Sequence, residues 1–157
     1  MKNKLIIRNP DIKETAIRLI ESMPLEPLHQ VEIREYHKDR TLAQNSLMWY
    51  WITIIAGERG EIKDDIHCEY KKKYLVPIFE RDDPEYAKMI QAVRDVQKAG
   101  MQTEARHLAD QIVKLTSTTD ADVKQFTEYL NDMEHGANKQ GIPLPHPEDR
   151  YYEAMGK

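Results

Sequence analysis

The sequence has 157 residues, 40% of them hydrophobic and 32% charged, which is typical of one compact globular domain. A chain of this length can bury a core without metal or disulfide staples. Its one cysteine, Cys68, cannot close an intramolecular disulfide, which favours a reducing compartment. The apolar run at residues 5–7 is too short for a signal sequence or a membrane span. We therefore expect a soluble protein with no membrane partner.

The charge balance limits which anionic partners the protein could bind and where on the chain they would bind. The formal net charge is −4, from 23 Lys and Arg against 27 Asp and Glu, which excludes strongly basic, histone-like binding. Residues 1–80 hold 13 basic and 13 acidic side chains, whereas residues 81–157 hold 10 and 14. A polyanion is therefore expected on the first half, where fewer carboxylates repel phosphate.

The opening residues predict a strand, a helix and a second strand. Residues 4–8 form a short β-type run, and Asn9 with Pro10 supplies an N-cap and a first helical residue. Pro24 ends the helical pattern. Residues 30–36 alternate between apolar and polar side chains, which is typical of a strand with one face in water.

Thr41 and Gln44 fit a capping box, which predicts that a second helix begins there. The body of this helix, residues 47–56, is apolar almost all round, more than a helix with only one side on a core requires. It is therefore expected at the centre of the fold or at a subunit interface. Gly57 and Gly60 end it.

The remaining elements are expected to be mostly helical. A third helix begins near Asp64 and ends at Pro77. Two helices, at residues 85–98 and 103–112, flank Gly100 as a peripheral hairpin. A weak strand at residues 112–116 follows.

The last helix has the clearest pattern. Thr119 is its expected N-cap, and apolar residues from Val123 to Ala137 recur every three or four positions. Gly141 stands where a C-cap belongs, and the prolines after it cannot continue a helix. Together these elements predict an α+β fold, with a small mixed sheet, packed helices, a helix-rich second half and an intertwined homodimer.

Two groups of carboxylates could suggest a metal site: Asp82, Asp83 and Glu85, then Asp120 and Asp122. The first group lies in a polar segment between helices, and the second lies where carboxylates cap a helix. The histidines show no paired spacing, and the chain has no glycine-rich phosphate loop. We therefore expect no metal, no cofactor and no catalytic residues, although a metal-dependent nuclease using these carboxylates stays open as an alternative.

The residues around the start of the second helix could bind DNA. Lys38 and Arg40 precede free helix N–H groups, a combination that binds phosphate. Gln44 and Asn45 could contact sugar or base edges, and Asn45 shares a helix face with Trp49, whose ring could stack on a base. A structural interpretation, in which Gln44 caps, Trp49 packs and Arg40 pairs with a nearby carboxylate, is favoured by composition alone.

The stretch Arg40–Asn45 with Trp49 resembles the helix-opening signature of the NinB (Orf) family of phage recombination proteins. The resemblance continues at residues 115–119 and at residues 141–145, so it spans most of the chain in the right order. Between residues 82 and 109 it supports no individual residue.

The resemblance implies a non-enzymatic, homodimeric DNA-binding protein of the bacterial host cytoplasm. It implies a preference for single-stranded DNA and a role in loading or exchanging recombination proteins, with the host single-strand DNA-binding protein as a candidate partner. The expected DNA-binding residues are Lys38, Arg40, Gln44, Asn45 and Trp49, with the lysine run Lys71, Lys72 and Lys73 as the second candidate site. The alternatives are a metal-dependent nuclease or resolvase acting on recombination intermediates, and an adaptor that touches only proteins.

The resemblance also implies one domain over residues 1–157. Its parts are a strand-helix-strand with two helices at 1–80, a variable helical insertion at 81–114, a C-terminal helix with a proline-rich segment at 115–147, and a tail at 148–157.

The apolar helix and the resemblance both predict a stable homodimer. Light scattering at micromolar concentration should give a mass of about twice 18.5 kDa, because a dimer could cover the apolar helix and sum two weak DNA-binding faces. A monomer at that concentration would count against the prediction.

Overall fold

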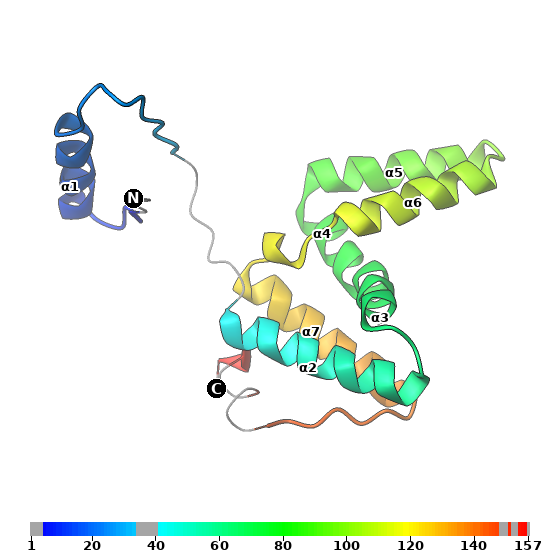
Figure 1. The fold of residues 1–157 in the computed structure, drawn as a ribbon. Helices are drawn as coiled ribbons and strands as arrows, with labels where there is room; N and C mark the ends of the chain where they lie inside the picture. The colour runs from blue at the N-terminus through cyan, green and yellow to red at the C-terminus, as the bar shows by residue number, and fades with distance from the viewer. Residues whose placement is uncertain (1–4, 34–40, 148–150, 152–153, 157) are drawn as a thin grey trace. The chain divides into compact units, whose positions relative to one another are not determined.

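The computed structural model describes residues 5–33, 41–147, 151 and 154–156. The chain divides into two compact units, residues 1–37 and residues 38–157. Helices make up all of the regular structure in the described residues, which contain no β-strand (Figure 1). The expectation of an α+β fold with a mixed sheet is therefore wrong.

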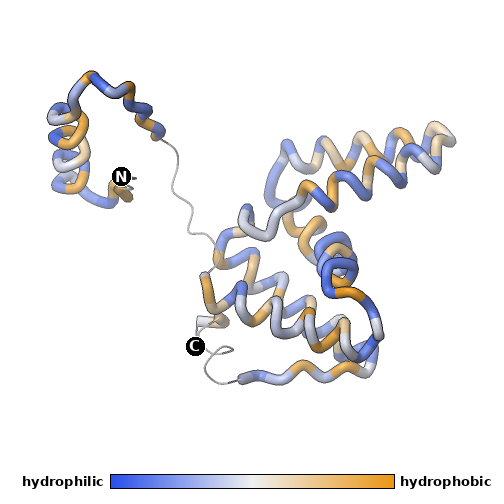
Figure 2. Tube along the Cα trace, in the orientation of Figure 1, coloured by the Kyte–Doolittle hydropathy of each residue, from blue (hydrophilic) through white to orange (hydrophobic). Residues whose placement is uncertain are grey.

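The first unit contains α1 (Pro10–Glu21), which begins as the sequence predicts. The side chain of Asn9 accepts a hydrogen bond from the N–H of Ile12 at 2.9 Å. None of the residues of α1 is buried, and Ile17 and Ile20 are 47% and 46% exposed. The apolar stripe of α1, visible in Figure 2, is thus only partly covered by the described residues of this unit.

The two expected strands do not form in the described residues, because these residues do not pair with another strand. Residues 5–8 and 30–33, the described parts of these two segments, are non-helical but join no ladder. An alternating pattern forms a strand only where a neighbour supplies hydrogen bonds and a core covers the apolar face. Val31 and Ile33 are instead 52% and 85% exposed. Alternation alone therefore could not establish a sheet.

The second unit is built around α2 (Leu42–Arg59), which packs against α3 (Lys63–Tyr70) and α7 (Val123–Lys139). The predicted capping box at its start and its end at Gly60, where φ is 66°, are confirmed, whereas Gly57, also expected to end the helix, lies inside it. Its buried residues are Gln44, Leu47, Met48, Trp51, Ile52, Ile55 and Ala56. Much of the apolar helix is therefore covered within one chain. None of the described helices has the length and hydropathy to cross a bilayer.

The segment after α3 departs from the sequence prediction. A π-helical turn, η1 (Lys71–Leu75), joins α3 directly to α4 (Val76–Asp82). Pro77 was expected to end the helix, but it lies in the first turn of α4. Proline lacks an N–H and crowds the preceding turn. The wider π-helical spacing, seen where the N–H of Val76 donates to the carbonyl of Lys71, places this proline without ending the helix.

The expected hairpin is present. Helix α5 (Pro84–Lys98) and helix α6 (Gln102–Leu115) pack against each other, and Gly100 adopts a φ of 86° in the turn between them. The weak strand expected at residues 112–116 is wrong, because α6 continues to Leu115. Val113 is buried eight residues after buried Ala105, so this stretch continues the helical spacing.

The final helix begins later than predicted. Thr119, its expected cap, lies in a short 3₁₀ turn, η2 (Thr118–Asp120). The N-cap of α7 is Asp122, which forms a capping box with Gln125. Asp122 and Gln125 thus satisfy the free N–H groups at the observed start of α7, a role that Thr119 was expected to have three residues earlier.

The chain after α7 turns at Gly141, whose φ is 76°, and runs on without helix through the prolines, as predicted. Ile142 and Leu144 are each only 7% exposed in this segment. The indole N–H of Trp51 donates to the carbonyl of Pro145 at 2.8 Å. This hydrogen bond attaches the segment to α2.

Gly136 of α7 tests the packing of the second unit. A Cβ at this position would lie 1.8 Å from the hydroxyl oxygen of Tyr74, so Gly136→Ala should lower the free energy of unfolding by about 2–3 kcal/mol through overpacking. Gly57→Ala is the control, because a Cβ there meets nothing within 4 Å and should stabilise α2 by up to about 1 kcal/mol. Urea denaturation of both variants measures the difference. Equal stability of the two variants would contradict the packing described.

Candidate nucleic-acid interface

The candidate site lies at the start of α2, directly after Lys38 and Arg40, which are outside the described residues. Gln44 is fully buried. Its side-chain oxygen accepts from the N–H of Thr41 at 3.1 Å. Its amide nitrogen donates to the carbonyl of Val123 at 3.1 Å and to the hydroxyl of Thr127 at 2.9 Å. Gln44 thus joins α2 to α7 and has no exposed surface to offer DNA.

Asn45, the next residue, is less buried than Gln44. It is half-buried, and its side-chain oxygen is buried without a hydrogen-bond partner among the described residues. A buried acceptor in this state costs free energy, and most such atoms in proteins are satisfied. The oxygen of Asn45 is therefore an unsatisfied acceptor, which an N–H donor could reach only after the groups that cover it move.

Trp49 lies one helical turn after Asn45 on α2 and is half-buried. Its ring contacts the imidazole of His67 from α3, with centroids 4.7 Å apart and planes inclined by 36°. His67 was not expected at this site, because a contact between two helices leaves no signal in the local sequence. The two rings form a tilted aromatic pair beside Asn45.

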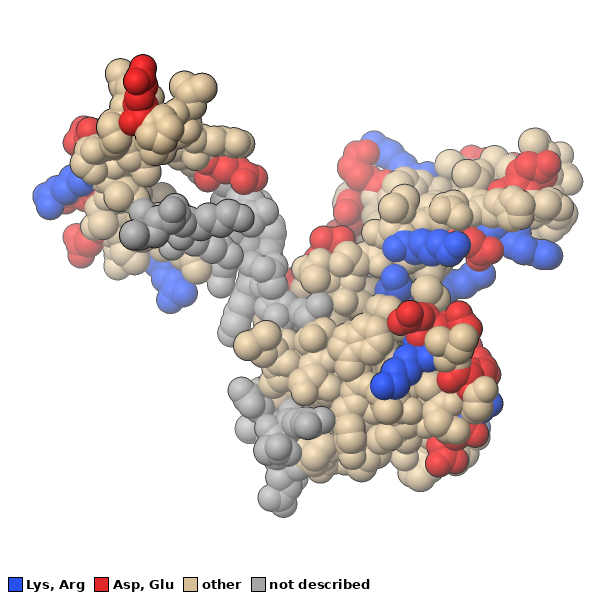
Figure 3. Space-filling model, in the orientation of Figure 1, with Lys and Arg blue, Asp and Glu red and all other residues tan. Residues whose placement is uncertain are grey.

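Charged side chains are absent from α2 until Glu58 and Arg59 at its end. From Leu42 to Gly57 the sequence contains no Asp, Glu, Lys or Arg. Figure 3 shows a broad uncharged surface over this part of the second unit. This face can stack and hydrogen-bond, but the cations that hold phosphate must come from neighbouring segments.

The lysine run is divided by the π-helical turn. Lys71 is buried, and its ammonium donates to the carbonyls of Val113 at 3.0 Å and Thr116 at 2.8 Å. These carbonyls lie at the C-terminal end of α6, where peptide oxygens lack helical partners and favour a cation. Lys72 and Lys73 are exposed. Lys71 is thus bound within the protein, whereas Lys73 is exposed and Lys72 forms an exposed ion pair with Asp110 of α6.

Three of the carboxylates considered for a metal site have structural roles. Arg81 and Gln125 hydrogen-bond to Asp82 and lower its pKa to about 2. Asp83 caps α5, as Asp122 caps α7. Within the part of the chain that the structure describes, no three His, Cys, Asp or Glu side chains are grouped to hold a metal ion. The nuclease alternative gains no support from these positions.

Comparison with protein-family models matches residues 1–93 to the family described as NinB protein. The chain belongs to the NinB family. This confirms the resemblance inferred from the motif at Arg40–Asn45, and it associates the protein with phage recombination, in a family that is generally accessory and non-catalytic. No curated protein and no solved structure matches the chain. The NinB match ends within α5, so α6 and α7 lie beyond it.

Lys71 and Lys73 offer a matched test of the divided lysine run. Lys71→Met should lower the free energy of unfolding by about 2–3 kcal/mol, because it removes a charged donor from two carbonyls at the end of α6. Lys73→Met removes the same charge from an exposed position and should change stability by less than about 0.5 kcal/mol. Thermal and urea unfolding measure both. Equal effects would contradict the role assigned to Lys71.

Proposed function

We propose that this NinB-family protein binds single-stranded DNA and acts as a non-enzymatic accessory in phage homologous recombination, assisting the loading or exchange of recombination proteins. The observation that carries the proposal is the arrangement on α2. The unsatisfied oxygen of Asn45 lies one turn from the half-buried ring of Trp49, which is itself paired with His67.

Such an arrangement suits an unpaired strand. Bases stack on aromatic side chains with little regard to sequence, which contributes about 1–3 kcal/mol per base. An amide oxygen accepts from the exocyclic amino groups of cytosine and adenine. Both groups are accessible in a single strand, whereas in a duplex the base faces are covered by stacking. We assign Trp49 the stacking role and Asn45 the polar contact.

Phosphate contacts are assigned to Lys38 and Arg40, which immediately precede α2 in the chain. The free N–H groups at a helix start add to the attraction for phosphate. Gln44 organises this helix start through its capping box, so its role is positioning rather than contact. Binding of this kind falls steeply with salt.

We further propose a homodimer in the cytoplasm of the bacterial host, with the host single-strand DNA-binding protein as a partner. The net charge of −4 disfavours strong binding by one chain, and two linked weak faces sum their contacts. Ile17 and Ile20 of α1 are exposed within the first unit, and in this proposal a second chain covers them. The competing function is a protein-only adaptor, which the uncharged face of α2 would also suit.

Asn45→Ala tests the proposed contact. The variant should bind labelled oligo-dC about three- to tenfold more weakly, since it loses one hydrogen bond to the base. Its melting temperature should be unchanged or slightly higher, because the side-chain oxygen forms no hydrogen bond within the described part of the chain. Fluorescence anisotropy and thermal unfolding measure the two effects.

The exposed neighbour Ser46 supplies the control, and Ser46→Ala should leave both quantities unchanged. Early melting of Asn45→Ala with normal binding would make Asn45 a structural amide. Absence of any DNA binding by the unaltered protein would favour the adaptor, and cleavage of the oligonucleotide with magnesium would favour the nuclease.

A further inference from the structure

A cationic surface lies where the α5–α6 hairpin meets η1. The ammonium of Lys72 forms an ion pair with Asp110 of α6 at 3.7 Å, and both side chains are about half exposed, at 57% and 49%. Arg106 and Lys114 stand four residues before and after Asp110 on the same helix. Residues four apart lie on one side of a helix. The ion pair therefore indicates that Lys72 lies on the side of α6 that carries Arg106 and Lys114.

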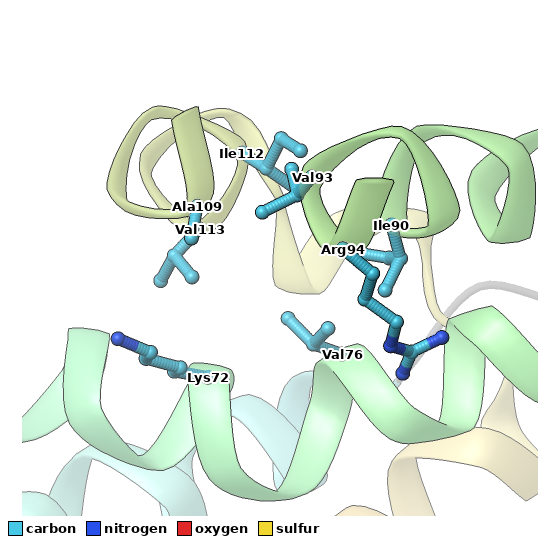
Figure 4. A pocket seen from close by; sticks show the side chains of 8 residues that line it. All are labelled: Lys72, Val76, Ile90, Val93, Arg94, Ala109, Ile112 and Val113. Atoms are coloured by element: carbon cyan, nitrogen blue, oxygen red, sulfur yellow. The ribbon is translucent and has the colours of Figure 1, made fainter. Parts of the chain in front are cut away.

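A cavity lies beside this surface, between the hairpin and the helices below it. An apolar cavity of about 170 Å³ separates α5 and α6 from η1 and α4. In Figure 4, Val113 and Ala109 face this cavity from α6, and Lys72 lies across from them on η1. At about 100° of rotation per residue, Arg106, Asp110 and Lys114 all lie within about 100° of Val113 and to one side of it. The cations thus border the cavity instead of filling it.

Arg106 differs from the other arginines described in the second unit. Arg59 pairs with Glu61 and Glu69, and Arg81 pairs with Asp82 and Glu128. Arg94 pairs with Glu80. Arg106 and Lys114 are exposed and form no ion pair with any described residue. Figure 3 shows basic side chains gathered beneath the hairpin. These two charges are available to an anion from outside the chain.

We propose that Lys72, Arg106 and Lys114, here termed the α6 cationic face, bind the phosphodiester backbone of single-stranded DNA. This inference rests on the proposed function and extends it, because two of the three cations lie beyond the residues matched to the NinB family. With Asp110 included, the face carries a net charge of +2. Arg106 and Lys114 are separated by about 12 Å along the helix axis, a length that about three stacked nucleotides span.

Neutralising Asp110 tests whether the α6 cationic face binds DNA. Its carboxylate lies between the two free cations and holds Lys72. A polyanion must approach this negative charge, so its removal should raise affinity by releasing Lys72 and relieving repulsion. A purely structural role for the ion pair would leave DNA affinity unchanged when Asp110 is neutralised.

The experiment measures the affinity of the full chain for fluorescein-labelled oligo-dT by anisotropy, from 50 to 200 mM NaCl. The double variant Arg106→Gln with Lys114→Gln should bind about tenfold more weakly at 50 mM salt, and the slope of log affinity against log salt should flatten by about 1.4. Asp110→Asn should bind about threefold more tightly. Circular dichroism confirms that each variant is folded.

The control is the double variant Lys98→Gln with Lys139→Gln, which changes net charge equally at exposed lysines at the ends of α5 and α7. It should retain nearly all of the affinity. Equal losses in the two double variants, or no gain in Asp110→Asn, would overturn the α6 cationic face and leave the proposed function standing. Failure of the unaltered protein to bind DNA would overturn both.

Discussion

The second unit depends on one buried side chain, that of Gln44. Its oxygen completes the capping box that starts α2, and its nitrogen donates to Val123 and Thr127 in the first turns of α7. A buried amide is tolerated only when its donors and acceptors are satisfied, which restricts how the two helices can pack. Gln44 therefore fixes the start of α2, its rotation and its contact with α7 together.

The rotation of α2 about its axis determines which of its side chains are exposed to solvent. With Gln44 turned toward α7, the next residue is rotated by about 100°, which leaves Asn45 half-buried instead of buried. Trp49, one turn later, then meets His67 on α3. The same principle operates in η1, where Lys71 turns inward to the end of α6 and Lys72 turns outward to Asp110. Adjacent residues of similar chemistry thus have different roles.

Much of the helical part of the fold was predictable because its signals are local. The capping box at Thr41, the turn at Gly100 and the end of α7 at Gly141 each depend on a few neighbouring residues. The sheet was wrongly predicted from alternation, because strand formation depends on a partner elsewhere in the chain. Pro77 was misjudged because a π-helical turn, which has no simple sequence signature, precedes it.

In the candidate site, too, the local features were predictable from the sequence, whereas the contacts between distant residues were not. Thr41 and Gln44 were recognised as a cap, but the bonds from Gln44 to α7 join residues about eighty positions apart and left no trace in the local pattern. The burial of Lys71 could not be predicted from the neighbouring sequence either, since it depends on carbonyls of α6. Asn45 and Trp49 could be selected because a spacing of four places them on one helix face.

The two tryptophans offer the most direct test of the account. Trp51 is fully buried with its indole N–H bonded to Pro145, whereas Trp49 is half-buried beside Asn45. In a ¹⁵N NMR titration with single-stranded DNA, the indole resonance of Trp49 should shift progressively while that of Trp51 stays in place. A saturating titration in which the Trp49 resonance does not move, while binding occurs, would contradict the claim that this face of α2 receives the strand.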